Sequence, residues 1–540
     1  MDWEVFGSFA RNTTTIKSDN NVGKTAITQL INACGVTSNT LQRAPISALP
    51  NCPFPNNQLS PFTATGNTNN PLGLNSMNAA QLAFINVDAT DVITYERSVV
   101  GGFVSGELGD FWGAGQIGYA AGGEYREEEL DSRADPFKAA GDIFGFNAQE
   151  SIQGSYDVKE AFAELSVPIL ANLPFVDYLG FEGGYRFSDY STGAGTTDTY
   201  KGGIEYSPVD WLNFRAIYNR AVRAPTAFEL FQAGDQNFPS YSDPCGSTAV
   251  SALSGAAQTT RIATCTAWFS AGGASYSGLS PFTQVNSQVQ AFATGTPGLQ
   301  PEIVDTYTYG VVFNPEWWPV GRIGISIDSF LLDLQGGISL RSVANILNSC
   351  TTGGGTGGDC LLSPRRSDGN IDFVNQTRSN VPGHSEIKGI DYNIRWSYDL
   401  ADVGLAGDFG IATLVTWIDT NEFGSIGFHS GGIGGGDPEW RAVTSFTYNW
   451  DKLSALLRWS WTDDMTQFNA RASVPAYDLW SIGARYDLAD NFSISANIDN
   501  IFDEQPPVFP EAQFFGQYNT DGSTYDQLGR SFRIGLTYRN

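Results

Sequence analysis

The chain contains 540 residues with a formal net charge of −27, and 13% of its residues are aromatic, 60 are glycine and only 16% are charged. The strong negative charge argues against a nucleic-acid partner. No apolar run reaches the length of about 18 residues that a transmembrane helix requires. Abundant glycine and aromatic residues are instead typical of a large β-barrel or of stacked β-sandwiches.

Alternating side chains predict β-strands along most of the chain, beginning with residues 2–12. The chain starts directly inside this strand pattern, so we expect it to be the remainder of a longer one. A long polar excursion over 13–90 follows, with a short helical pattern at Val22–Ile31. Two more excursions, 232–297 and 341–370, interrupt the strands expected at 92–108, 114–133, 158–167, 179–190, 199–207, 212–222, 305–313, 322–334, 387–398, 405–418, 441–450, 453–461, 479–488, 492–501 and 532–538.

The strand at 212–222 illustrates the pattern. Its even-numbered positions from Leu212 to Tyr218 are apolar or aromatic, whereas Asn213, Arg215 and Asn219 lie on the opposite face. Pro225 cannot donate to a sheet, so the strand must end by about there, and Thr226 can cap a short turn. One apolar and one polar row describe a wall that faces lipid on one side and water on the other.

The connections between these strands differ in length at the two ends. Short links such as 399–404, 449–452 and 487–491 alternate with longer ones such as 419–439 and 462–476. Short turns at one end and long loops at the other are typical of outer-membrane barrels. The sequence therefore predicts an all-β fold, a transmembrane antiparallel β-barrel of about 15–16 strands, as a single domain over 1–540 with the three excursions as extracellular loops.

The six cysteines fall into three local groups in the polar excursions. We expect the pairs Cys34–Cys52, Cys245–Cys265 and Cys350–Cys360, although sequence alone does not fix the pairing and free thiols are the alternative. Each bond would close one loop and stabilise it by roughly 3 kcal/mol. Disulfides indicate an oxidising compartment. No metal-binding spacing is present, so neither a metal nor another cofactor is expected.

The second excursion also carries a scatter of aromatic side chains. These could stack on a ligand, or they could pack the loop beneath its disulfide. As candidate substrate-binding residues we name Tyr241, Trp268, Phe269, Tyr276, Phe282 and Phe292.

No pattern in the chain predicts enzymatic chemistry. Nucleophile-elbow, zinc-protease and P-loop motifs are absent from the sequence, and the two histidines are far from each other. The clustered carboxylates at 127–129 and 463–464 are expected to be solvated charge at strand ends or in loops. We therefore expect no catalytic residues.

Five segments, taken together and in order, resemble the C-terminal part of a TonB-dependent outer-membrane receptor. Residues 220–231 resemble the family segment RAxRAPxxxELF, 295–310 resemble NPxLKPE…T…G, 386–391 resemble a strand start xxGxD, 497–506 resemble NLFDxxP, and 525–538 resemble the closing GRxxxxGLxY strand. The matching residues are Arg220, Arg223, Pro225, Glu229, Pro301, Glu302, Gly389, Asp391, Asn500, Phe502, Asp503, Gly529 and Arg530. Arg220 and Arg223 could line a pathway, but we expect them to anchor the strand end to carboxylates in the lumen.

The resemblance implies uptake of a scarce nutrient, such as an iron-siderophore, cobalamin or a saccharide, across the outer membrane of a Gram-negative cell. Family members have about 22 strands and an N-terminal plug on which the TonB energy complex acts. No plug pattern is found in this sequence, so we expect a monomeric, partial barrel without the plug and the first strands. Two alternatives remain: a plugless passive porin, and a secreted soluble β-rich protein that binds carbohydrate.

Overall fold

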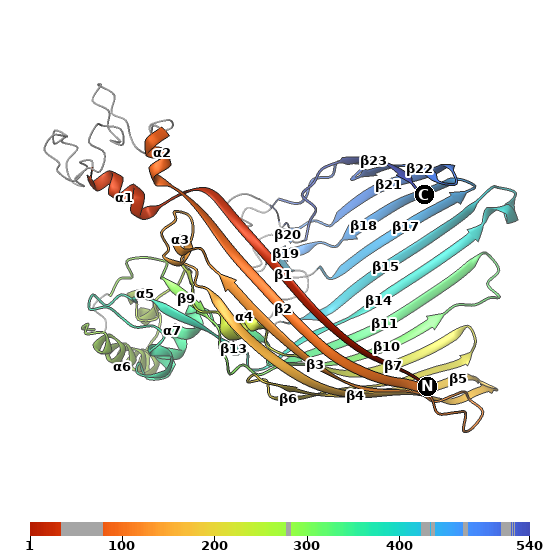
Figure 1. Cartoon of the computed structure of the whole chain (residues 1–540), viewed down its shortest axis with the longest axis horizontal. Helices are drawn as coiled ribbons and strands as arrows, with labels where there is room; N and C mark the ends of the chain where they lie inside the picture. Colours follow the sequence, from red (N-terminus) through yellow and green to blue (C-terminus); the bar gives the residue numbers. More distant parts are fainter. Residues whose placement is uncertain are drawn as a thin grey trace.

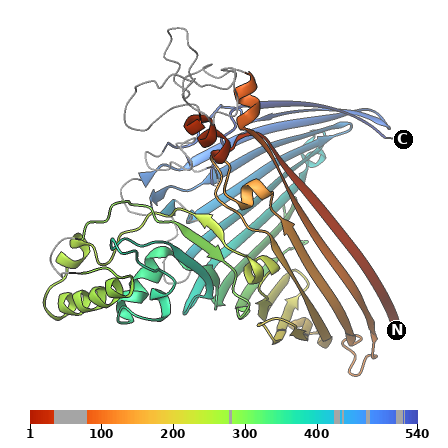
Figure 2. The same ribbon diagram turned by 60° about the vertical axis from the view of Figure 1, so that its left-hand side comes forward.

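The computed structural model describes residues 1–33, 79–276, 282–422, 432–433, 438–467, 473–508, 520, 522 and 524–539. Within these residues, sixteen strands form one sheet in which each strand pairs with its neighbours in chain order (Figure 1). The strands are β1 Asp2–Val22, β2 Asn86–Glu107, β3 Gly118–Arg133, β4 Ile152–Leu173, β5 Val176–Tyr190, β6 Thr196–Val209, β7 Leu212–Arg223, β10 Glu302–Phe313, β11 Arg322–Gln335, β14 His384–Asp399, β15 Asp408–Asn421, β17 Trp440–Trp450, β18 Leu453–Thr462, β21 Tyr477–Ala489, β22 Phe492–Asp499 and β23 Ser531–Tyr538. Figure 2 shows that this sheet is strongly curved.

The prediction of an antiparallel barrel-type sheet is confirmed, and each strand expected from the sequence is present. The bounds of the first excursion were wrong. Strand β1 continues to Val22 and β2 begins at Asn86, so the connection covers 23–85 and holds the helices α1 (Lys24–Ala33) and α2 (Ala79–Ile85). A strand needs only about 9–11 residues to cross a bilayer. Beyond that length both faces meet water, so the alternation that marks a strand in the sequence disappears.

The two ends of the sheet differ as predicted. At one end, connections of two residues join β4 to β5, β6 to β7, β17 to β18 and β21 to β22. At the other end lie the longer segments, including the helices α1 to α7 (Figure 1). No helix in the described part of the chain is long and apolar enough to span a membrane.

The two faces of the sheet carry different side chains. Phe214, Tyr309 and Ile327 lie on one face, where they are exposed. The other face holds Gly154 of β4, and the ring of Phe231 from α4 (Ala227–Phe231) lies directly over it. Because α4 follows β7 yet contacts β3 and β4, it must cross the hollow of the curved sheet. The row that contains Gly154 therefore lies on the concave face of the sheet, toward the lumen. The row of apolar side chains lies on the convex face.

The second and third excursions are not separate loops, because they fold together. We call residues 224–301 and 336–383 the loop domain. A four-stranded sheet in the order β12 (Ile338–Leu340), β13 (Val374–Asn380), β9 (Ala291–Thr294), β8 (Asp235–Asn237) joins them. The helices α5 (Ser247–Ser251), α6 (Gly255–Ala271) and α7 (Val343–Thr352) pack on one side of this sheet around their own hydrophobic core.

Two smaller features complete the loop end. Helix α3 (Pro136–Ala139) lies between β3 and β4. Lys138 on this helix is buried and forms an ion pair with Asp91 of β2, beneath the ring of Phe146. A further small sheet is formed by β16 (Gly432–Ile433), β19 (Met465–Gln467) and β20 (Ser473–Val474).

Candidate functional site: the lumen wall and the loop domain at its mouth

The concave wall is lined by paired charges. Arg215 of β7 reaches across β10 to Asp328 of β11, with Nη2 and Nε of the arginine 2.6 and 2.8 Å from Oδ1. This bridge passes over Gly310, where an added Cβ would lie 2.1 Å from the same carboxylate oxygen. The glycine therefore clears the space that the ion pair occupies. Asp391, a family-motif residue in the adjacent position of β14, accepts a hydrogen bond of 2.6 Å from Thr416.

A second group of lumen charges lies on β3, β4 and β5. The guanidinium of Arg126 lies 3.0 to 3.7 Å from carboxylate oxygens of Glu124, Glu128 and Glu160. Arg186 of β5 also pairs with Glu160 at 3.2 Å. Paired arginines and carboxylates give the wall a polar, charged lining, which suits a path for a solute.

The structure divides the two motif arginines between opposite faces. Arg223 lies on the lumen face and bonds to Glu302 at 2.6 Å and Glu229 at 2.9 Å, as expected for an anchor. Arg220 has the parity of Phe214 and lies on the convex face, where its Nη2 is 2.7 Å from Oδ2 of Asp305. The expectation that Arg220 binds a carboxylate in the lumen was therefore wrong about the face.

The segment after Pro225 turns into the mouth through a local capping motif. The hydroxyl of Thr226 accepts a hydrogen bond from the backbone N–H of Glu229, and the Glu229 carboxylate accepts one from the backbone N–H of Thr226. Burial alone would raise the pKa of Glu229, but hydrogen bonds from Arg223 and Thr226 outweigh it and hold that pKa below its usual value. This network starts α4 and directs it across the lumen.

The contact between Gly154 and Phe231 gives a direct prediction. A Cβ at Gly154 would lie 2.0 Å from the Phe231 ring, so Gly154→Ala should displace α4 and destabilise the loop domain by about 1–3 kcal/mol. Limited proteolysis at increasing temperature measures this loss. The double substitution Gly154→Ala with Phe231→Ala removes the clash and should recover part of the lost stability. Equal instability of the single and double variants would show that the contact is not the cause.

Two of the three expected disulfides are confirmed. Cys245 bonds to Cys265 and Cys350 bonds to Cys360. All four lie in the core of the loop domain, next to α6 and α7. The remaining pair, Cys34 and Cys52, lies outside the described residues.

The candidate aromatic residues do not form one exposed binding surface. Trp268 and Phe269 on α6 are each only 1% exposed and belong to the core of the loop domain. Tyr241, Tyr276 and Phe282 are partly buried and pack against that core. For these five residues the alternative role, packing beneath the disulfide, is the one that the structure supports. Phe292 differs, because it lies on the face of the small sheet that points away from the core.

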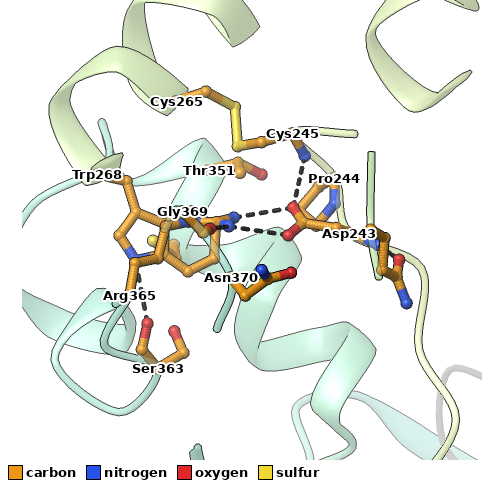
Figure 3. Close-up of polar contacts among 12 residues, drawn as sticks. Asp243, Pro244, Cys245, Cys265, Trp268, Thr351, Ser363, Arg365, Gly369 and Asn370 are labelled. Atoms are coloured by element: carbon orange, nitrogen blue, oxygen red, sulfur yellow. Dashed lines mark hydrogen bonds and ion pairs between the residues drawn. A yellow bond between two sulfur atoms is a disulfide. The ribbon is translucent and has the colours of Figure 1, made fainter. Parts of the chain in front are cut away.

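A buried ion pair that the sequence did not indicate holds the two excursions together (Figure 3). Both Arg365 and Asp243 have fully buried side chains, and two guanidinium nitrogens of Arg365 each lie 2.8 Å from an oxygen of Asp243. Arg365 also donates to the carbonyl of Gly369 and stacks on the rings of Trp268 and Phe269, 3.8 and 4.2 Å from their centroids. Asp243 comes from the second excursion and Arg365 from the third, so their pairing needs both segments folded.

A second ion pair in the loop domain predicts pH dependence. Arg341 donates to Asp359 at 2.7 Å, and this hydrogen bond holds the pKa of Asp359 below its usual value. A carboxyl with a lowered folded-state pKa stabilises the fold above its unfolded pKa of about 4, and this contribution is lost as the pH falls further. We expect protease resistance of the loop domain to decline below about pH 4. In Asp359→Asn this part of the pH dependence should vanish, and its persistence would contradict the assignment.

The last motif residues build the connection between β22 and β23. Asn500 is buried with a φ of 53°, and its side chain accepts from the N–H of Glu504 and donates to the carbonyl of the same residue. Asp503 accepts a hydrogen bond of 2.9 Å from the backbone N–H of Arg530, beside Gly529. Phe502 is exposed. These residues therefore shape a turn. Gly389 lies within β14 at a β-bulge, where an added Cβ would be 2.8 Å from the ring of Phe330 in β11. Pro301 directly precedes β10.

Known proteins share this architecture. The family model "TonB dependent receptor-like, beta-barrel" matches residues 38–501. Among solved structures, the ferric enterobactin receptor PfeA of Pseudomonas aeruginosa is similar with a TM-score of 0.52 and 17% identity, over 86% of this chain and 55% of the PfeA chain. The siderophore receptor PirA of Acinetobacter baumannii gives 0.51 and 13%, over 84% of this chain and 60% of its own. A search of curated protein sequences finds no match.

These structural similarities establish the fold, and this chain spans little more than half the length of either solved structure. The family consists of receptors and transporters of the Gram-negative outer membrane rather than enzymes. The match over 38–501, together with the curved sixteen-stranded sheet, means that this chain belongs to the TonB-dependent receptor β-barrel family.

Proposed function

We propose that this chain forms the wall and outer mouth of a TonB-dependent importer in the outer membrane, which takes up a scarce small-molecule nutrient without changing it chemically. The observation that carries the proposal is the polar concave wall, on which Arg215 with Asp328 and Arg126 with Glu160 lie beneath a folded loop domain. The convex face is apolar and suits contact with lipid. The nutrient would bind at the loop domain and pass along the charged wall.

The two edges of the sheet support a larger assembly. Among the described residues, β1 pairs only with β2, and β23 pairs only with β22. Unpaired N–H and C=O groups in lipid cost several kcal/mol each. We therefore propose that further strands of the same monomeric receptor close the barrel at about 22 strands, and that a plug in that receptor contacts the TonB complex.

Uptake measurements separate this proposal from a passive porin. A strain lacking the gene should lose growth on the limiting nutrient, and the restored gene should support growth only in cells with functional TonB. A protonophore should stop uptake within minutes, because the energy complex depends on the proton gradient. Uptake that is unchanged without TonB would contradict the proposal and favour a diffusion channel.

A further inference from the structure

The loop domain stands out from the rest of the chain by its lack of net charge. It contains five arginines and six carboxylates, a net charge of −1, against −27 for the whole protein. Most of these charges are already engaged. Arg341, Arg365 and Arg366 pair with aspartates, and Arg378 donates to Gln232 above the ring of Phe228.

The face of the small sheet that is turned away from the loop-domain core is uncharged. Ala291 and Val374 point into the core, so their neighbours along β9 and β13 point to the opposite face. We call the part of this face that β9, β13 and the residue before β13 provide the platform; it consists of Phe292, Thr294, Phe373, Asn375, Thr377 and Ser379. All six side chains are half-buried. The sheet lies between the helices α5–α7 and the barrel strands, which turns the platform toward the barrel (Figures 1 and 2).

The platform combines an aromatic pair with unpaired polar groups. The rings of Phe292 and Phe373 lie 6.0 Å apart at 72°. Within the described part of the chain, the side chains of Asn375, Thr377 and Ser379 have no hydrogen-bond partner. An amide offers both donors and acceptors, as does a hydroxyl. An aromatic ring offers a flat surface on which the apolar C–H face of a sugar ring packs.

These features do not suit a strongly anionic ligand. A ferric tris-catecholate complex carries several negative charges and is best held by arginine or lysine side chains that are free to donate. The platform has none, and the acidic remainder of the chain repels anions. A neutral ligand rich in hydroxyl groups is not repelled by this negative charge, and it can form hydrogen bonds with Asn375, Thr377 and Ser379.

Building on the proposed uptake function, we infer that the platform binds a neutral oligosaccharide as the nutrient captured at the mouth of the barrel. The ligand would stack on Phe292 and exchange hydrogen bonds with Asn375 and Thr377.

The test measures binding to the full-length receptor purified in detergent. The probes are a panel of neutral hexasaccharides, namely α- and β-linked glucans, a xylan, a mannan and a galactan fragment, with ferric enterobactin as the anionic probe. We expect at least one hexasaccharide to bind and ferric enterobactin not to bind. Phe292→Ala and Asn375→Ala should each weaken binding about tenfold, the effect of removing one stacked ring or one hydrogen-bonding amide.

Two substitutions outside the platform serve as controls for the loss of affinity. Asn348→Ala changes an exposed asparagine on α7, and Leu361→Ala changes an exposed apolar residue. Both should retain wild-type affinity, and intact disulfides in every variant verify the folded loop domain. Failure of all hexasaccharides to bind, or wild-type affinity of Phe292→Ala with Asn375→Ala, would overturn the inference. Uptake that still required TonB would then leave the proposed importer function standing, whereas uptake without TonB would contradict that function separately.

Discussion

Replacing Arg365 with alanine is expected to unfold the loop domain while leaving the barrel strands in place. The substitution leaves the carboxylate of Asp243 buried without its partner, and breaking a buried pair in this way typically costs about 3–5 kcal/mol. It also removes the stacking on Trp268 and Phe269 and the hydrogen bond to Gly369. Because no barrel strand contributes to this cluster, the damage should remain local.

Arg366 provides the matched control for this experiment. It neighbours Arg365 in the chain, but its side chain is 53% exposed and its Nε lies 3.7 Å from Asp368. A solvent-exposed pair contributes at most about 1 kcal/mol. Arg365→Ala should make sites in the loop domain cleavable by protease at temperatures where Arg366→Ala remains resistant. Equal protease resistance of the two variants would contradict the central role of the Arg365–Asp243 pair.

Removing the Cys245–Cys265 disulfide is expected to have the next largest effect. The bond joins residues separated by 20 positions. In the chain-entropy model, closing a loop of that length stabilises the fold by about 3 kcal/mol. The double substitution Cys245→Ala with Cys265→Ala should lower the unfolding temperature of the loop domain, measured by protease resistance at successive temperatures.

The second disulfide offers an internal comparison. Cys350 and Cys360 are separated by 10 positions, so the same model assigns their bond about 0.6 kcal/mol less than the longer loop. Both alanine pairs should destabilise the loop domain to a similar degree. Wild-type stability after loss of either bond would show that the core around α6 and α7 is sufficient without it.

The strands were predictable from the sequence because apolar and polar side chains alternate along a strand that crosses a bilayer. Positions 212–222 show this well, since one row faces lipid and the other faces the lumen, and β7 follows those bounds to within one residue. The same counting places Arg220 in the row of Phe214, so its face could have been read correctly from parity alone. Residues 13–22 were missed as part of β1 because a strand outside the bilayer has no apolar face.

The loop domain could not be predicted in the same way. The side chains of Trp268 and Phe269 on α6 are covered by Arg365 and its surroundings, about a hundred positions further along the chain. Polar, glycine-rich flanks made these aromatic residues resemble exposed groups. Of the contacts that hold the loop domain together, only the two disulfides could be predicted, because each joins cysteines within a single excursion.

The most direct test of the proposed receptor is the side of the membrane on which the loop domain lies. An epitope inserted directly after Gly354, where an added Cβ would meet no other atom within 4 Å, should bind antibody on intact cells. The same epitope inserted into the two-residue turn between Asp451 and Lys452 should bind antibody only after the outer membrane is permeabilised. The reverse pattern, or equal access to both positions in intact cells, would contradict a barrel whose loop domain captures nutrient outside the cell.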